Sequence, residues 1–163
     1  MKALNYLIIL LLVTSFSCSE KQKDDSTDPI EITKEIEESF ESYVNHVNTK
    51  GIKGVDSYFS KDKRFYWIED GVMQYPNRES LLKGIEEFYP TVSTVSLKVS
   101  KTNIEVIDSN NVMLYVEYKE DILLNSGYKF TLDGAMSILM IPEDGIWKFL
   151  MGHSSIKKPR GDY

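Results

Sequence analysis

Two stretches of the chain carry apolar residues at spacings of three and four, which is the pattern of helices with one buried face. The first stretch, 29–50, follows Asp28, which is suited to cap a helix, and ends at Gly51, a residue type common beyond helix C-termini. The second stretch, 78–89, follows another capping residue, Asn77. The two apolar faces consist of Ile32, Ile36, Phe40, Tyr43, Val44 and Val47, and of Leu81, Leu82, Ile85 and Phe88.

Shorter elements are predicted between these two helices. Residues 54–62, "GVDSYFSKD", favour a short helix that presents Val55, Tyr58 and Phe59. Residues 64–75, "RFYWIEDGVMQY", contain two β-rich runs around an Asp-Gly pair, which is a strong signal for a hairpin. We therefore expect three helices in the N-terminal half, with a small hairpin between the second and the third.

From Thr91 onward the chain alternates between apolar and polar residues, the pattern of strands with one buried face. Three turn-forming sequences, "DSNN", "NSG" and "PEDG", divide this part into four strands at 94–107, 112–124, 128–141 and 146–156. Such short connections imply antiparallel neighbours. The alternation changes phase near 101–103, which indicates a β-bulge that would bend the sheet.

The alternation also predicts which side chains point toward the helices. In the second strand, Val112, Leu114, Val116, Tyr118 and Ile122 share the apolar face. In the last strand, Trp147, Phe149 and Met151 share a face with His153. An inward-pointing histidine is a candidate acid or base, because its pKa lies close to physiological pH. The alternative is a structural histidine that is hydrogen-bonded to a neighbouring element.

The order of these elements resembles the nuclear transport factor 2-like fold, also called SnoaL-like, over about residues 30–156. The C-terminal "DGIWKFLMGHSS" resembles the closing strand of that family, with Trp147, His153 and Ser155 at the matching positions. "NRESLL" resembles the start of the third helix, with Asn77 in place of the usual glycine. The resemblance implies an α+β cone in which three N-terminal helices pack on a strongly curved antiparallel sheet.

In members of this fold the open end of the cone can hold a small apolar molecule, and some members are enzymes. The resemblance implies that Tyr43, Trp67, Tyr75, Tyr89 and Trp147 are candidate ligand-binding residues, with His153 as the candidate catalytic residue. A steroid isomerase of this fold uses a carboxylate base with oxyanion donors. Tyr115, Glu117 and Asp133 have suitable chemistry, but the alternation places them on the opposite, mixed face of the sheet.

The N-terminal segment resembles a bacterial lipoprotein signal. Residues 6–13 are apolar, but this run is shorter than the roughly 20 residues that span a bilayer. Residues 15–18, Ser-Phe-Ser-Cys, resemble a relaxed lipobox of the Bacteroidetes type without its usual leucine, which implies that Cys18 is lipidated. Residues 23–25, Lys-Asp-Asp, resemble the export signal of the same group and imply display on the outer face of the outer membrane. The alternatives are an ordinary secreted protein, a periplasmic location and a merely solvated linker.

Composition excludes several classes of function. The chain has a formal charge of −6 and no basic stripe, which argues against binding of nucleic acid. A single cysteine excludes an internal disulfide and a cysteine-rich zinc site. The only histidines, His46 and His153, lack a coordinated carboxylate spacing, so we expect no metal and no cofactor.

These observations predict a signal peptide at 1–17, an acidic tether at 18–28, a single domain at 29–157 and a tail at 158–163. The first functional hypothesis is a lipid-anchored surface protein that binds a small apolar or amphipathic molecule without catalysis. The alternatives are an isomerase, lyase or hydrolase that uses His153, and a dimeric interaction module without a ligand. The mixed face of the sheet, which includes Met113 and Tyr115, resembles the surface through which relatives form two-fold dimers, and this resemblance implies a homodimer.

Overall fold

A computed structural model describes residues 28–157 of the chain. Two α-helices lie in this range, α1 (Pro29–Lys50) and α2 (Arg78–Phe88), with two short 3-10 turns, η1 (Val55–Tyr58) and η2 (Tyr89–Thr91). The strands are β1 (Tyr66–Glu69), β2 (Val72–Tyr75), β3 (Val92–Asp108), β4 (Asn111–Leu124), β5 (Lys129–Glu143) and β6 (Ile146–Ile156). Cys18 and the predicted signal peptide and tether lie outside the described residues, as does the tail.

The six strands form one sheet in the order β2-β1-β6-β5-β4-β3. The four long strands pair antiparallel with their sequence neighbours, as the short connections predicted. The prediction of a wholly antiparallel sheet is wrong at β1, which pairs with β6 in parallel. A parallel pair needs a long crossover, and the chain from β2 through β5 supplies it.

The prediction of three N-terminal helices is also wrong, because the described residues contain two. The expected second helix is only the single 3-10 turn η1, which starts after Gly54 in a left-handed conformation (φ 80°). Phe59 then becomes extended, and the Ser60 backbone N–H donates a hydrogen bond to the carbonyl of Phe149. The residues that would have continued the helix therefore pair with β6 in an extended conformation instead.

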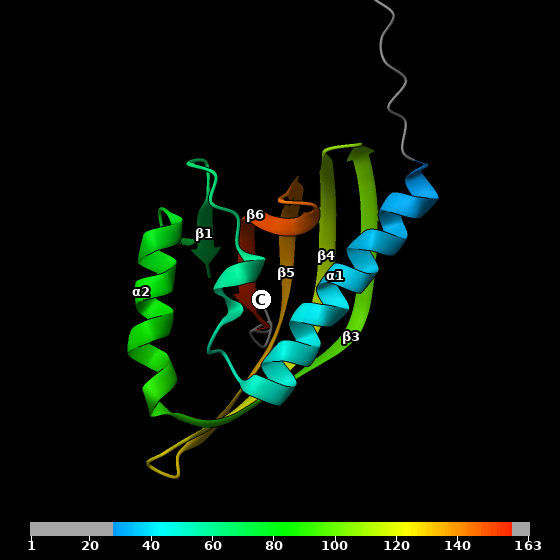
Figure 1. The fold of residues 1–163 in the computed structure, drawn as a ribbon. Coiled ribbons are helices and arrows are strands. Elements are labelled where there is room, and N and C mark those ends of the chain that lie inside the picture. Colours follow the sequence, from blue (N-terminus) through cyan, green and yellow to red (C-terminus); the bar gives the residue numbers. More distant parts are fainter. Residues whose placement is uncertain (1–27, 158–163) are drawn as a thin grey trace, which may run out of the picture.

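Extra residues shift the strand pairing at several places, and two of them bear on the predictions. One extra residue of β3 is Ser100, one position before the predicted range. In β6 the extra residue is Leu150, since Met140 pairs with Phe149 and Leu139 with Met151. Bulges increase local twist and bend the strand. Figure 1 shows the result, in which the long strands curve past α1, and α2 lies beside β1.

The core lies on the inner face of this curved sheet. One apolar face of α1 packs against β3 and β6. The inward residues of β4, predicted from alternation, are all buried: Val112, Leu114, Val116, Tyr118 and Ile122. No helix in the described range is long and apolar enough to cross a membrane. The core leaves one space partly open, and residues of α2, β1 and the sheet border it.

Candidate functional site

That open space is a cavity of about 330 Å³. Its walls come from both α-helices, from η1 and from the strands β1 to β6, so the whole fold contributes to it. Most of the lining side chains are apolar or aromatic, and the aromatic ones are Tyr43, Phe59, Trp67, Tyr75, Phe88, Tyr118, Phe130 and Phe149. A concave, mostly apolar cavity with a few polar groups is typical of a small-molecule site.

One carboxylate, that of Glu120, lies in this apolar lining. Glu120 is on β4 between Tyr118 and Ile122, both of which also line the cavity. Burial raises the pKa of Glu120 from its ordinary 4.5 to about 6, and no hydrogen bond or nearby cation offsets that burial. Its proton is therefore exchanged close to neutral pH, as catalytic acids and bases require.

Two phenols lie near Glu120. Burial raises the pKa of Tyr43, and the negative charge of Glu120 raises it further. Burial likewise raises the pKa of Tyr118 to about 12, with added effects from the charges of Glu120, Glu69 and Asp70. Both hydroxyl groups therefore remain protonated at neutral pH and can donate hydrogen bonds.

Two further carboxylates border the cavity at the β1–β2 hairpin. The pKa of Glu69 is raised by burial and by the charge of Asp70. Asp70 has a left-handed backbone (φ 48°), and its Oδ1 accepts a hydrogen bond of 3.0 Å from the backbone N–H of Ile156. Within residues 28–157, the charged side chains that line the cavity are all acidic: Glu69, Asp70 and Glu120.

Trp67 forms part of the cavity wall where β1 pairs with β6. Its Nε1 donates a hydrogen bond of 3.2 Å to the Ser154 hydroxyl. The six-membered part of the indole lies directly over Gly152, and a Cβ at that position would overlap the ring. The absence of a side chain at residue 152 thus allows Trp67 to cover this part of the sheet.

The cavity brings together three of the five predicted ligand-binding residues, Tyr43, Trp67 and Tyr75. Tyr89 instead lies in an adjoining groove, where the Nζ of Lys53 is 5.5 Å from the centre of its ring. Trp147 is buried outside the lining, and its Nε1 donates a hydrogen bond of 2.8 Å to Glu35 on α1. Placing these two rings at the cavity was therefore wrong.

The prediction that His153 points inward is wrong as well. His153 is exposed and is not among the lining residues. The bulge at Leu150 shifts the alternation of β6 by one residue, so that Gly152 and Ser154 face inward where Met151 and His153 were expected. The structure therefore places no histidine in the cavity.

The sequence analysis did not identify Glu120 as a site residue, although the alternation of side chains in its strand indicates that it points inward. The inward face of the second predicted strand included Tyr118 and Ile122, and strict alternation puts position 120 between them on that face. A carboxylate at an inward position of an otherwise apolar strand is a direct indication of a functional group. No set of three His, Cys, Asp or Glu side chains within residues 28–157 is arranged to hold a metal ion.

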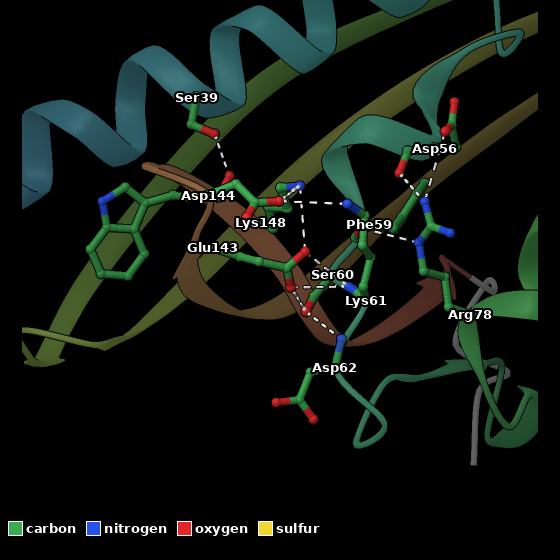
Figure 2. Close-up of polar contacts among 11 residues, drawn as sticks. Ser39, Asp56, Phe59, Ser60, Lys61, Asp62, Arg78, Glu143, Asp144 and Lys148 are labelled. Atoms are coloured by element: carbon green, nitrogen blue, oxygen red, sulfur yellow. Dashed lines mark hydrogen bonds and ion pairs between the residues drawn. The ribbon is translucent and has the colours of Figure 1, made fainter.

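The cavity wall formed by Val55 and Phe59 is held from outside by polar contacts, shown in Figure 2. Arg78, at the start of α2, donates hydrogen bonds of 2.8 and 3.2 Å to the carbonyls of Asp56 and Phe59. These contacts join η1 to α2, so the two elements form one continuous wall of the cavity.

A second cluster fixes the same segment to the β5–β6 hairpin (Figure 2). The Ser60 hydroxyl and the Lys61 backbone N–H both donate hydrogen bonds to the carboxylate of Glu143. The Nζ of Lys148 lies 3.5 Å from that carboxylate and 3.8 Å from Asp144. The side chains of Lys148 and Glu143 are 6% and 19% exposed, so this ion pair is largely shielded from solvent, whereas Asp144 is exposed. We refer to Ser60, Glu143, Asp144 and Lys148 as the clamp.

Comparison with solved structures identifies the architecture. A proposed scytalone dehydratase from Novosphingobium aromaticivorans superposes with a TM-score of 0.70 at 14% identity, over 79% of this chain and 86% of that one. A nuclear transport factor 2-like superfamily protein from Salmonella enterica superposes with a TM-score of 0.67 at 16% identity, over 82% of this chain and 96% of that one. The chain has the nuclear transport factor 2-like fold.

A hexachlorocyclohexane dehydrochlorinase, LinA type 2, also has this fold, with a TM-score of 0.64 at 13% identity over 79% of this chain and 87% of that one. No family model and no curated protein matches the sequence. At these identities the likeness shows the fold alone, and one fold supports many activities.

Proposed function

We propose that this domain binds a small, largely apolar molecule in its cavity. The observation that carries the proposal is a space of about 330 Å³ whose lining is mostly apolar and aromatic. Polar groups in it are few: the carboxylates, two serines and the tyrosine hydroxyls. Apolar walls supply affinity and a few polar groups supply orientation, which is the usual composition of such sites.

The test is a titration with the neutral fluorescent probe N-phenyl-1-naphthylamine. We expect saturable binding to the wild type and its loss in Leu132→Trp, because a larger side chain on the inward face of β5 would fill the cavity. Met113→Trp is the matched control, since Met113 lies on the outer face of the sheet and is 37% exposed. No saturable binding to the wild type, or equal binding to the Leu132→Trp variant, would refute the proposal.

A second candidate function is catalysis of proton transfer, and Glu120 is the observation that favours it. A carboxylate with a pKa of about 6 can accept a proton from a bound molecule, while the protonated Tyr43 or Tyr118 stabilises the negative charge that develops. Two of the structures with the same fold are named as a dehydratase and a dehydrochlorinase. In this candidate Glu120 takes the role that the sequence suggested for His153.

Hydrogen–deuterium exchange of a ketone separates this candidate from simple binding. The C–H protons of 2-tetralone exchange slowly in buffered D₂O, and NMR follows the exchange. A catalyst that uses Glu120 should accelerate it, lose most of the acceleration in Glu120→Gln and keep it in His153→Gln. Exchange at the buffer rate with wild-type protein would remove this candidate and leave the binding proposal standing.

We also propose that Cys18 is lipidated and that the domain is displayed on the outer surface of the outer membrane. Support comes from the lipobox-like Ser-Phe-Ser-Cys and the Lys-Asp-Asp that follows it. Cys18→Ala should abolish labelling by a radioactive fatty acid. Protease added to intact cells should remove the domain, and protection in intact cells but not in lysed cells would contradict surface display.

A homodimer through the outer face of the sheet is a further proposal. Met113 is exposed there, and Tyr115 donates a hydrogen bond of 3.1 Å to Glu117 beside it. A chain that begins at Asp28 should sediment as a dimer, and Met113→Glu should make it a monomer. A wild-type monomer at high concentration would refute this proposal.

A further inference from the structure

The charged groups of the cavity all have the same sign. Glu69, Asp70 and Glu120 line it, and among residues 28–157 no lysine, arginine or histidine does. The described residues include many lysines and arginines, but these lie outside the cavity lining. A cavity with this lining attracts positive charge and repels anions.

All three carboxylates line the same cavity as Tyr118, and the negative charge of each raises the pKa of that phenol. They are nevertheless not gathered tightly enough to bind a metal ion within the described residues. A bulkier organic cation fits this arrangement better than an inorganic ion does.

The carboxylate of Glu120 has no hydrogen-bond or ion-pair partner among residues 28–157. Burial alone accounts for its raised pKa, which means that no hydrogen bond or cation among residues 28–157 offsets the cost of its charge. A buried charge is normally paired. An ammonium group brought by a ligand would supply the missing partner.

The walls around these carboxylates suit the same ligand. Tyr43, Trp67, Tyr75 and Tyr118 line the cavity with them, and aromatic rings attract cations as well as apolar groups. The remainder of the lining is aliphatic, including Leu81, Ile85 and Leu132. An apolar body could therefore occupy the aliphatic part while its charged group lies among the carboxylates.

We infer that the ligand of this cavity is an organic cation, with one protonated amine on an apolar body of about the size of a fused two-ring aromatic. The inference rests on the proposed binding function and specifies its ligand class. The ammonium group lies between Glu120 and the Glu69–Asp70 hairpin and donates its hydrogen bonds to their carboxylates.

A matched series of three probes tests the charge separately from the apolar body. These are 1-naphthylmethylamine, 1-naphthylmethanol and 1-naphthoate, which at pH 8 are mostly cationic, neutral and anionic. Calorimetric titration of the wild type should show the amine binding at least tenfold more tightly than the alcohol, and the carboxylate not binding. Glu120→Gln should reduce the advantage of the amine over the alcohol to less than threefold.

Two further variants keep the result interpretable. Glu69→Gln, at the other side of the predicted ammonium position, should also reduce the advantage of the amine, and Glu105→Gln, an exposed residue of β3, should not. Lowering the pH from 8 to 5 should weaken amine binding to the wild type, because Glu120, which lines the cavity together with Tyr43, Tyr118, Glu69 and Asp70, becomes protonated.

The outcomes distinguish this inference from the proposed function. If the alcohol or the naphthoate binds as tightly as the amine, the ligand is not a cation, although the cavity still binds apolar molecules. If no member of the series binds and N-phenyl-1-naphthylamine also fails to bind, the proposed function fails and the inference fails with it. An amine advantage that survives in both Glu120→Gln and Glu69→Gln would also overturn the inference.

Discussion

Two partly buried carboxylates of this domain, Glu143 and Glu120, differ in what surrounds them. Burial opposes ionisation of Glu143, but hydrogen bonds from Ser60 and Lys61 and the charge of Lys148 outweigh it and lower its pKa. Burial opposes ionisation of Glu120 too, no group among residues 28–157 offsets this effect, and the pKa of Glu120 rises to about 6. The clamp at Glu143 stabilises the fold, whereas the ionised carboxylate of Glu120 lowers the free energy of unfolding.

This difference in surroundings indicates a structural role for Glu143 and a functional role for Glu120. A carboxylate that several donors satisfy joins two segments, here the chain after η1 and the β5–β6 hairpin. An unsatisfied carboxylate in a cavity lowers stability when it is ionised, and such costs persist mainly at functional sites. Substitutions at the two sites should therefore change stability in opposite directions.

The largest effect is expected in the clamp. Lys148→Ala should destabilise the domain by about 3 kcal/mol, because removing one partner of an interior ion pair leaves the other without compensation. Urea denaturation at pH 7 measures this free energy. Lys157→Ala is the control, since Lys157 pairs with Asp133 in an exposed position and should change stability by less than about 1 kcal/mol. Equal effects of the two substitutions would show that the clamp is not an interior ion pair.

The opposite sign is expected at Glu120. Between pH 4.5 and about pH 6 the folded protein keeps a proton that the unfolded chain has lost, so this residue lowers stability as the pH rises through that range. Glu120→Gln removes the effect and should raise the free energy of unfolding by up to about 2 kcal/mol at pH 8, with little change at pH 4.

Urea denaturation of the wild type and the variant at both pH values checks the prediction for Glu120. Glu105→Gln, on an exposed position of β3, should show no such pH-dependent gain. A Glu120→Gln variant that is less stable than the wild type at pH 8 would mean that the carboxylate has a stabilising partner after all.

The smallest effect is expected at Ser60, which is fully buried and donates a hydrogen bond to Glu143. Ser60→Ala should cost about 1 kcal/mol, the usual net value of one hydrogen bond, because the Lys61 N–H and Lys148 still contact the carboxylate. Thermal unfolding compared with Ser57→Ala, an exposed residue of η1, measures the difference. A loss as large as that of Lys148→Ala would show that the hydroxyl, and not the ion pair, holds the clamp together.

Much of the fold could be predicted from local pattern. The four long strands and the inward face of β4 follow from alternation, and α1 and α2 follow from helical spacing and their capping residues Asp28 and Asn77. The failures have non-local causes. Residues 54–62 carry a helical pattern, but from Phe59 the backbone pairs with β6, which lies 90 positions further along the chain.

The candidate site was predicted only in part for the same reason. His153 lies on the outer face because of one extra residue at Leu150, and nothing in "WKFLMGHS" marks where a strand gains a residue relative to its partner. Trp147 is buried as expected of its type, but residue type does not say that Glu35 would be its neighbour. Glu120 could have been predicted, because the alternation of side chains along β4 places it on the inner face of the sheet.

A single NMR titration tests the central claim, that Glu120 is an unpartnered carboxylate in a ligand cavity while Glu143 is a satisfied one. Carboxyl carbon shifts of the ¹³C-labelled glutamates would be followed from pH 2.5 to pH 8 and assigned by the signals that disappear in Glu120→Gln and Glu143→Gln. The account predicts a midpoint near pH 6 for Glu120 and a midpoint below 4.5 for Glu143 in the same spectra. A midpoint for Glu120 at or below that of Glu143 would contradict it.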